Sequence, residues 1–354
     1  MAGRAGELVK HSGYMQCAAG VVGVLLMTSG MLAAQTTRTV KHMGYTASTP
    51  VNVRLYVDGR SRDGALMGHT DDAVVFRSGR DGQQVNVSIR RVDRAFFDVT
   101  VPRTELNDAL VAENWSKAGI LLLPVVRPLV PYLDLPQNNG VDLVYDAGHY
   151  LMKSTGFRMT SETSRDLSEA ATARAKSAFQ LFHGLGKVSW HGLGLAGQAR
   201  SAEALLALGK RDMANDVIEG MSEPFPDDEG MGYYWMVRSS MALADEDYSA
   251  ALDGAVRAVC FANKDINVFP DALLLSARCY EKLESYHRAR DVYFEVARLF
   301  PTTTAGKRAL VYLKNVRASG HTDGKEARGV VNVFFGVEEE MNKKADRLLD
   351  RRSK

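Results

Sequence analysis

The residues that most resemble a chemical motif are the glycines of HGLGKVSWHGLGLAGQAR, residues 183–200. Gly192, Gly194 and Gly197 have the G-x-G-x-x-G spacing with which dinucleotide-binding proteins hold a pyrophosphate at the start of a helix. That chemistry needs a strand before the glycines and another strand after the helix. Only the short segment KVSWH precedes them, and the expected helix leads into DVIEGMSEPFP, which ends a helix. We therefore expect a turn between helices here, with no nucleotide and no other cofactor.

Other residues that could catalyse a reaction or bind a metal are scattered. His183 and His191 would lie on one face of a continuous helix, but two ligands do not complete a site, and no Cys or carboxylate stands at zinc-like spacing beside them. The carboxylate runs at 71–72 and 227–229 fall in predicted loops, where solvation explains them. The sequence predicts no metal site and no enzyme. A hydrolase site within residues 102–165 is the enzymatic alternative.

The chain contains three cysteines. Cys17 lies in the segment that we expect to be removed on export. Cys260 is expected late in one helix and Cys279 in the next helix, and exported proteins meet an oxidising environment. We hypothesise a disulfide between Cys260 and Cys279. Two small buried thiols are the alternative.

The composition is that of a folded protein with little net charge. Hydrophobic residues make up 45% of the chain and charged residues 24%, and the formal net charge is +2. Such a balance supplies no strong attraction to nucleic acid or to an anionic membrane. We expect neither as a partner.

The first 34 residues differ from the rest of the chain. Arg4 and Lys10 precede an apolar core at 18–27, and residues 33–34 are both Ala. This is the layout of a secretory signal peptide, so we expect its removal and export of the protein to the periplasm. An uncleaved membrane anchor is the alternative, although the apolar run is short for the roughly 20 residues of a spanning helix. Only an uncleaved segment would contact a membrane.

Residues 51–101, after a linker at 35–50, predict a small closed β-barrel. The segment contains five short runs rich in Val, Ile, Phe and Tyr, separated by Asp-Gly, Ser-Gly or charged breaks. Closure into a barrel would remove the exposed edges that such strands otherwise present.

The same residues resemble the Sm-like small barrel, through Asp58-Gly59 after an apolar strand and the segment GALMGHTDDAVVF. In that family an Asp-x-apolar-Asn element and a final Arg-Gly hold RNA bases. Here residues 71–74 are Asp-Asp-Ala-Val, and Arg90 is followed by a second Arg. The resemblance therefore implies an SH3-like or Sm-like barrel used for protein binding or packing. Binding of peptidoglycan or another cell-wall polysaccharide through the barrel is the alternative.

Residues 102–182 predict helices. An apolar segment in this region is interrupted by three prolines, each of which must kink or break a helix: Pro124, Pro128 and Pro131. Amphipathic stretches predict helices from Thr104, over 141–153 and over 164–182. Whether these helices are degenerate copies of the repeat that follows them stays open.

An internal repeat between residues 195 and 318 is the most informative pattern. Segments starting at Leu195, Gly232 and Pro270 place small and large residues in one shared register. The small residues let two helices approach closely, the large ones fill the spaces beside them, and a closing proline ends the second helix. The pattern consists of Ala202, Gly209, Ala214, Trp235, Tyr248, Ala251, Ala277, Tyr280, Tyr286, Ala289, Tyr293 and Pro301.

This register resembles the tetratricopeptide repeat, a helix-turn-helix unit of about 34 residues. The closing copy is similar to those of periplasmic members that serve outer-membrane or cell-wall assembly. The resemblance implies an all-α solenoid whose concave groove binds protein, with groove-lining side chains from the first helix of each unit. The candidates are Arg238, Met241, Leu274 and Arg278.

Residues 327–352 predict a C-terminal amphipathic helix with one apolar stripe. We expect it to cap the last hydrophobic edge of the solenoid; a dimerising coiled coil is the alternative. The whole pattern predicts an α+β multidomain chain, in which a small N-terminal β-barrel precedes a helical solenoid. The expected function is an exported protein-binding scaffold in cell-envelope assembly.

Overall fold

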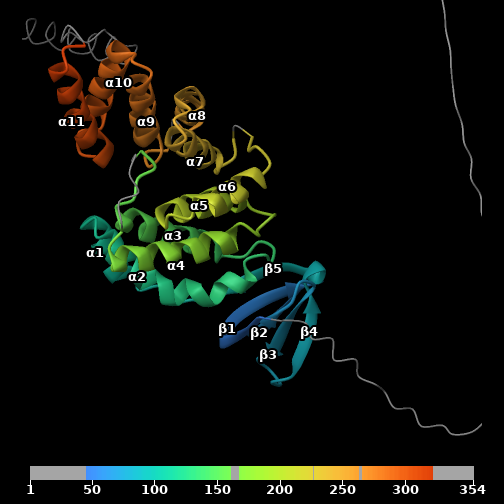
Figure 1. Ribbon diagram of the computed structural model, residues 1–354. Coiled ribbons are helices and arrows are strands. Elements are labelled where there is room, and N and C mark those ends of the chain that lie inside the picture. Colours follow the sequence, from blue (N-terminus) through green and yellow to red (C-terminus); the bar gives the residue numbers. More distant parts are fainter. Residues whose placement is uncertain (1–44, 161–166, 226, 263–264, 322–354) are drawn as a thin grey trace, which may run out of the picture. The chain divides into compact units, whose positions relative to one another are not determined.

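The computed structural model describes residues 45–160, 167–225, 227–262 and 265–321. The predicted signal peptide and C-terminal capping helix lie outside these residues. Within them, an antiparallel sheet precedes a series of helices (Figure 1). The α+β class is therefore confirmed.

The sheet contains β1 (Tyr45–Val57), β2 (Arg60–His69), β3 (Ala73–Ser78), β4 (Gln84–Ser88) and β5 (Val92–Phe97), in the order β4-β3-β2-β1-β5. Successive residues of β1 point to opposite faces of the sheet, so Val51, Val53 and Leu55 are buried whereas Arg54 is exposed. Asp58 and Gly59 have φ angles of 50° and 74°, which the tight turn from β1 to β2 requires.

The sheet is open, so the predicted closed barrel is wrong. Its edges are β4 and β5, which do not pair with each other. A loop forms hydrogen bonds with the outer edge of β5 instead. The Phe97 N–H donates to Asn139 Oδ1 at 2.8 Å, and Asn139 Nδ2 donates to the Phe97 carbonyl at 3.1 Å. The Ala95 N–H donates to the Pro136 carbonyl at 3.2 Å. Because this loop covers β5, closure by β4 is not needed.

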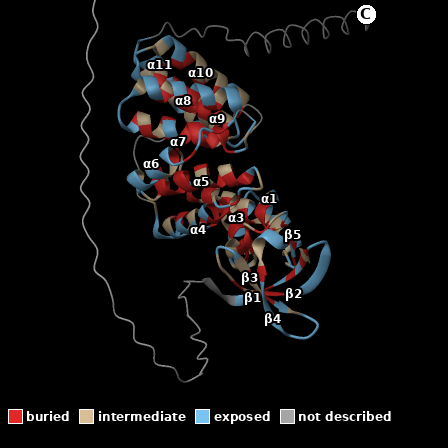
Figure 2. Cartoon of the chain, turned by 90° about the vertical axis from the view of Figure 1, so that its right-hand side faces the viewer, coloured by how far each residue is buried: buried red, intermediate tan, exposed pale blue. Residues whose placement is uncertain are grey.

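The buried face of the sheet packs on the helices that follow it. One hydrophobic cluster contains Val53 and Leu55 of β1, Phe97 of β5, and Leu129 and Tyr132 of a 3-10 helix, η2 (Arg127–Tyr132). The buried residues run from the sheet into the helices (Figure 2). The sheet and the first helices therefore share one core.

The helices are α1 (Arg103–Val111), α2 (Trp115–Val126), α3 (Val141–Thr155), α4 (Glu169–Leu185), α5 (Leu193–Ala207), α6 (Arg211–Glu219), α7 (Met231–Ala244), α8 (Tyr248–Phe261), α9 (Phe269–Lys282), α10 (Tyr286–Leu299) and α11 (Thr304–Ala318). Pro124 lies inside α2, and the chain changes to the 3-10 helix η2 one residue before Pro128. No helix in the described part of the chain combines the length and the apolar character needed to cross a membrane.

Each helix packs on the next one in the chain, and alternate helices also pack side by side. The helices α3, α5, α7, α9 and α11 form one such row, which we call the first-helix layer. Pairs α5–α6, α7–α8 and α9–α10 follow the predicted register, so the helical repeat is confirmed.

Most of the residues that carry the repeat pattern are at helix–helix contacts. The five alanines and Tyr293 are fully buried, and Trp235 is nearly so. Tyr248, Tyr280 and Tyr286 are half-buried, and Pro301 is exposed directly after α10. Gly209 differs from the prediction of a packing residue: it is exposed, with a φ of 69°, and it ends α5 in the left-handed conformation that glycine adopts most easily.

The glycine-rich stretch joins α4 to α5, as the predicted turn between helices requires. A Cβ atom on Gly194 would lie 1.9 Å from the Val188 carbonyl oxygen, and one on Gly197 would lie 2.6 Å from Leu185 Cβ. These glycines therefore let α5 pack directly on the turn that precedes it. Residues 183–216, all of which are described, lie in helices and turns.

Replacing Gly194 by Ala should destabilise the fold by about 1–3 kcal/mol, because the new methyl group would overlap with backbone. Gly192→Ala is the matched control, since its nearest neighbour would be 3.8 Å away, on Glu229. Urea unfolding of both variants measures the difference. A Gly194→Ala variant as stable as the control would contradict this packing.

Asn139→Ala should cost about 1–3 kcal/mol, because it leaves the Phe97 N–H and carbonyl at a partly buried edge without partners. Asn86→Ala on the exposed strand β4 is the control, with an expected change within about 0.5 kcal/mol. Equal effects in urea unfolding would show that the loop does not seal β5.

Candidate functional site

A polar cavity of about 450 Å³, which we call the central pocket, lies on the first-helix layer. Its walls come from the start of α2, from α3 and the loop after it, from α5, α7 and α9 with the loop before α9, and from the start of α11. The lining consists of Glu113, Trp115, His149, Met152, Lys153, Arg158, Met159, Arg200, Glu203, Tyr233, Met236, Ile266, Asn267, Val268, Pro270, Asp271 and residues 302–305.

A buried ion pair from α5 forms one wall of the central pocket. Arg200 Nη1 lies 3.0 Å from Glu203 Oε2, and the two side chains are 4% and 11% exposed. The Arg200 guanidinium also stacks on the rings of Tyr233 and Phe182, at 4.3 and 4.9 Å from their centroids. Its Nε has no hydrogen-bond partner among the described residues. Because the guanidinium contacts two rings and a carboxylate, its position is fixed.

Burial and the charge of the partner act in opposite directions on the pKa of each residue of the pair. Burial raises the pKa of Glu203, and the charge of Arg200 acts against that rise. Burial also disfavours the charge on Arg200, but Glu203 and Tyr233 more than offset it, so the pKa of Arg200 lies above its ordinary value. We infer that Arg200 carries its charge throughout the physiological range.

His149 lies beside this ion pair and is neutral. Its Nδ1 is 3.4 Å from Arg200 Nη2. Burial, followed by the charges of Arg200 and Lys153, lowers the pKa of His149 to about 3. The imidazole therefore experiences a positive electrostatic potential.

Two further cations line the central pocket. Lys153 Nζ lies 3.7 Å from the centroid of the Trp115 ring, and burial, followed by the charge of Arg158, lowers the pKa of Lys153. Arg158 Nε lies 4.0 Å from Asp271 Oδ2. Burial raises the pKa of Asp271.

The four residues predicted to line a groove do not share one surface. Arg238 and Met241 line a second cavity of about 570 Å³ between α6, α7 and α8, where Arg238 stacks on Trp235 at 5.4 Å. Leu274 is fully buried in the core, which corrects its assignment to a groove. Arg278 is also buried, with its guanidinium 5.7 Å from the Tyr312 ring.

The residues of the central pocket are not among those that the sequence predicted to form a site. Arg200 and Glu203 carried the clearest signal, because they are opposite charges three positions apart in the small apolar run LAGQARSAEALLA. A helix of that composition is buried on most sides, so its charges must pair with each other. His149 and Asp271 come from distant segments and show no such local signal.

The two histidines of the glycine-rich stretch have separate contacts. His183 stacks on Phe179 at 5.5 Å, and His191 Nδ1 accepts a hydrogen bond from the Leu193 N–H at 3.1 Å. Among the described residues, no group of three or more His, Cys, Asp or Glu side chains could hold a metal ion.

The predicted disulfide is not formed. Cys260 is exposed near the end of α8, whereas Cys279 is buried inside α9, and both are free thiols. The two side chains therefore face different surroundings although their helices are neighbours. Burial raises the pKa of the Cys279 thiol to about 12, so it stays protonated.

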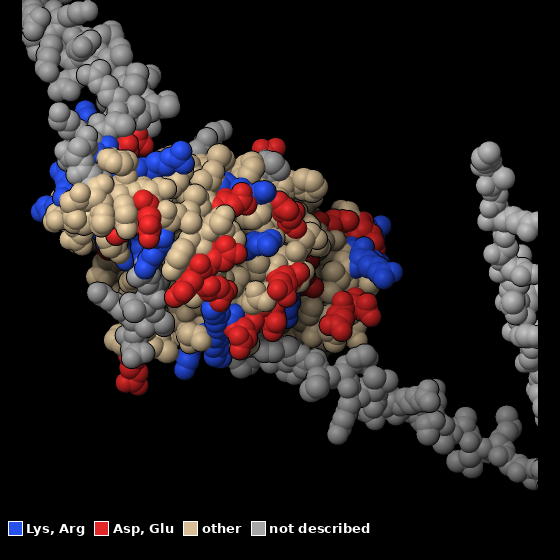
Figure 3. Space-filling model, turned by 45° about the horizontal axis from the view of Figure 1, so that its top comes forward, with Lys and Arg blue, Asp and Glu red and all other residues tan. Residues whose placement is uncertain are grey.

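The surface carries charges of both signs. Figure 3 shows acidic and basic side chains intermixed on one face of the molecule. Asp71 and Asp72 are exposed at the turn between β2 and β3. This arrangement agrees with the small net charge of +2.

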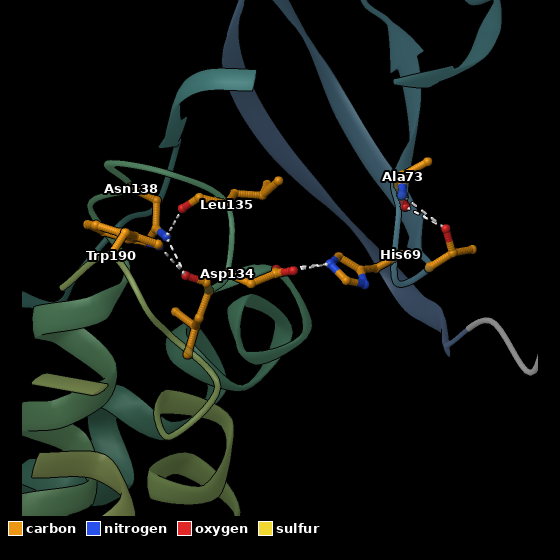
Figure 4. Close-up of polar contacts among 8 residues, drawn as sticks. His69, Ala73, Asp134, Leu135, Asn138 and Trp190 are labelled. Atoms are coloured by element: carbon orange, nitrogen blue, oxygen red, sulfur yellow. Dashed lines mark hydrogen bonds and ion pairs between the residues drawn. The ribbon is translucent and has the colours of Figure 1, made fainter. Parts of the chain in front are cut away.

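A part-buried polar contact joins the sheet to the loop after η2, and further bonds hold that loop in place (Figure 4). His69 Nε2 lies 2.9 Å from both carboxylate oxygens of Asp134. Asn138 Nδ2 donates to the carbonyls of Leu133 and Leu135, at 2.9 and 2.7 Å, and Trp190 Nε1 donates to Leu133 at 3.3 Å. These contacts fix the loop that covers β5.

Arg200→Met should destabilise the protein by about 3–5 kcal/mol at neutral pH, because it leaves Glu203 buried without its cation. The positive charge of Arg200 lowers the pKa of Glu203, so without Arg200 the pKa of Glu203 rises further. The native variant then holds a proton that the unfolded chain has released, and its stability falls as pH rises.

The loss of stability relative to the unmodified protein, measured by urea unfolding, should therefore be smaller at about pH 5 than at about pH 7. Arg257→Met is the control, because its ion pairs are exposed and should contribute much less. A deficit that is independent of pH would contradict the buried pair.

The chain was compared with known proteins. No protein-family model matches it. No match is found among curated proteins either. The tetratricopeptide and Sm-like resemblances therefore stay predictions from the sequence.

Proposed function

We propose that this chain is an exported, non-enzymatic scaffold that binds a protein partner through the first-helix layer and acts in cell-envelope organisation. The observation that supports it most is the central pocket, to which α3, α5, α7, α9 and α11 all contribute. Stacked helical units commonly bind partners on a surface shared by several units. The proposal of export depends on the predicted signal peptide, and the proposal of an envelope partner depends on the tetratricopeptide resemblance.

The side chains of the central pocket suit recognition of a protein segment. Trp115 and Tyr233 are aromatic types that dominate protein interfaces. Met152, Met159 and Met236 also line the pocket, but they are at most 8% exposed and most of each side chain belongs to the packed core. The ion pair of α5 adds fixed charges to this lining.

Catalysis is less consistent with the same residues. The best-placed general base is His149, but a base with a pKa of about 3 accepts protons poorly near neutral pH. The carboxylates of Glu203 and Asp271 each face an arginine. The described part of the sheet offers no feature that favours the polysaccharide-binding alternative.

A photo-crosslinking amino acid at Ile266, which is 60% exposed and lines the central pocket, should capture a discrete protein in intact cell envelopes. The matched control is Val256 on α8, which is 40% exposed and lies outside the pocket lining. Gel analysis and mass spectrometry of the adducts identify the partner. Adducts that are the same at both positions, or none at 266, would contradict the proposal.

A further inference from the structure

We propose that residues 156–160, the segment directly after α3, act as a clasp that holds the first-helix layer in a curved form and covers part of α9 and α11. This inference rests on the proposed function, because it names what controls access to the same layer. Its evidence is a set of contacts that join the two ends of the row of helices. We call residues 156–160 the clasp.

The clasp leaves α3 in a fixed direction. The helix α3 ends at Thr155, and Gly156 turns the chain out of it with a φ of 73°. The Thr155 hydroxyl donates to the Met152 carbonyl at 2.7 Å and accepts the Phe157 N–H at 3.0 Å. Phe157 packs against both hydrophobic clusters that include residues of α5. The start of the clasp is therefore anchored on its own side of the row.

The middle of the clasp contacts α9. Arg158 Nε lies 4.0 Å from Asp271 Oδ2 in the first turn of α9, and the two side chains are 22% and 24% exposed. Met159 is buried in a hydrophobic cluster that includes Ala272 of α9. Burial raises the pKa of Asp271, and the charges of Arg158 and of Arg308 on α11 act against that rise. Asp271 therefore experiences the charges of both the clasp and α11.

The far end of the clasp contacts α11. Thr160 is fully buried, and its Oγ1 accepts a hydrogen bond from Arg308 Nη1 at 3.1 Å, across 148 residues of the sequence. Arg308 Nη2 also donates to the Tyr312 hydroxyl at 3.1 Å, within α11 itself. Figure 1 shows the segment after α3 reaching toward α9. The clasp thus joins α3 to the helix at the other end of the first-helix layer.

Such a contact is unusual for stacked helical units, because each unit ordinarily contacts only its neighbours. The helices α5, α7 and α9 lie between α3 and α11 in the row. Packed helices are about 8–10 Å apart, so a straight row would separate α3 from α11 by about 35 Å. Five extended residues span at most about 17 Å. The row must therefore bend toward the clasp, and the clasp opposes its straightening.

The contacts at the far end are few enough to break while the rest of the fold remains. A partly exposed ion pair such as that of Arg158 contributes little to stability. Release would expose Met159 and Thr160, which are buried in the closed form, so the clasp stays closed without a partner. Segments that move on binding come from the less stable parts of a fold. The clasp has the properties of such a segment.

The clasp also limits the surface that the proposed partner uses. Arg158 and Met159 line the central pocket, together with Asp271 of α9 and residues 302–305 at the start of α11. A partner segment that extends from the central pocket along α9 toward α11 would meet the clasp. Binding of such a partner and closure of the clasp therefore compete.

The first test removes both polar contacts in the full chain with the double substitution Arg158→Gln and Thr160→Val. The matched control is Arg257→Gln with Thr172→Val, because the ion pairs of Arg257 and the hydrogen bond of Thr172 do not bridge the row. Amide hydrogen exchange of residues 156–160 should become about tenfold faster in the clasp variant and stay unchanged in the control. Thr160→Val alone should give a smaller change of the same kind if the double variant does not fold. Unchanged exchange would overturn the clasp.

Spin labels on α3 and α11 then measure the curvature of the row. The labelled chain carries Asp146→Cys and Lys314→Cys at exposed positions, with Cys17 and Cys260 replaced by Ser. Cys279 is buried and stays unlabelled. The clasp variant should give a longer and broader distance between the labels than the unmodified and control chains. An unchanged distance in a variant whose residues 156–160 exchange faster would overturn the proposal.

Crosslinking at Ile266 connects the clasp to the proposed function. Capture of the partner should increase by up to about tenfold in the clasp variant, because apparent affinity follows the fraction of open molecules. A longer label distance with unchanged or reduced capture would overturn the competition. Capture at 266 with unchanged label distances would show that only this inference is wrong. A longer distance without capture from any chain would leave the clasp standing and remove the scaffold function.

Discussion

The helical region depends on one constraint: helices built from small residues must be covered on both sides. In α5, twelve of fifteen residues are buried, because α4 and the preceding turn pack on one side and α7 on another. Gly194 and Gly197 make that approach close enough. A charged residue in such a helix has little access to water, so Arg200 and Glu203 form an ion pair with each other.

The same constraint explains why the central pocket is preorganised. Arg200 is held by Glu203 and by the rings of Tyr233 and Phe182, so its guanidinium has one fixed position in the wall of the pocket. Binding to such a site loses little side-chain entropy.

The sequence predicted local features well and long-range features poorly. Alternation in β1 and the spacing of alanines such as Ala277 and Ala289 follow from short periods, and both match buried positions. The sheet stays open because the edge of β5 is covered through Asn139, which bonds to Phe97 across 42 residues and leaves no local pattern. The prediction that Leu274 lines a groove was wrong, because the side of a helix that faces solvent depends on all the elements that pack against the helix. Arg200 and Glu203 were visible in the sequence, but their meaning required knowing that α5 is buried.

The central claim is that α5 is the most enclosed helix of this region and holds the binding charges in place. Amide hydrogen exchange followed by mass spectrometry tests it directly, with the neighbouring helix α6 as internal reference, since only Ala214 and Ile218 are buried there. We predict that peptides from α5 exchange far more slowly than those from α6, and only through global unfolding. Exchange of α5 as fast as that of α6 would contradict the account.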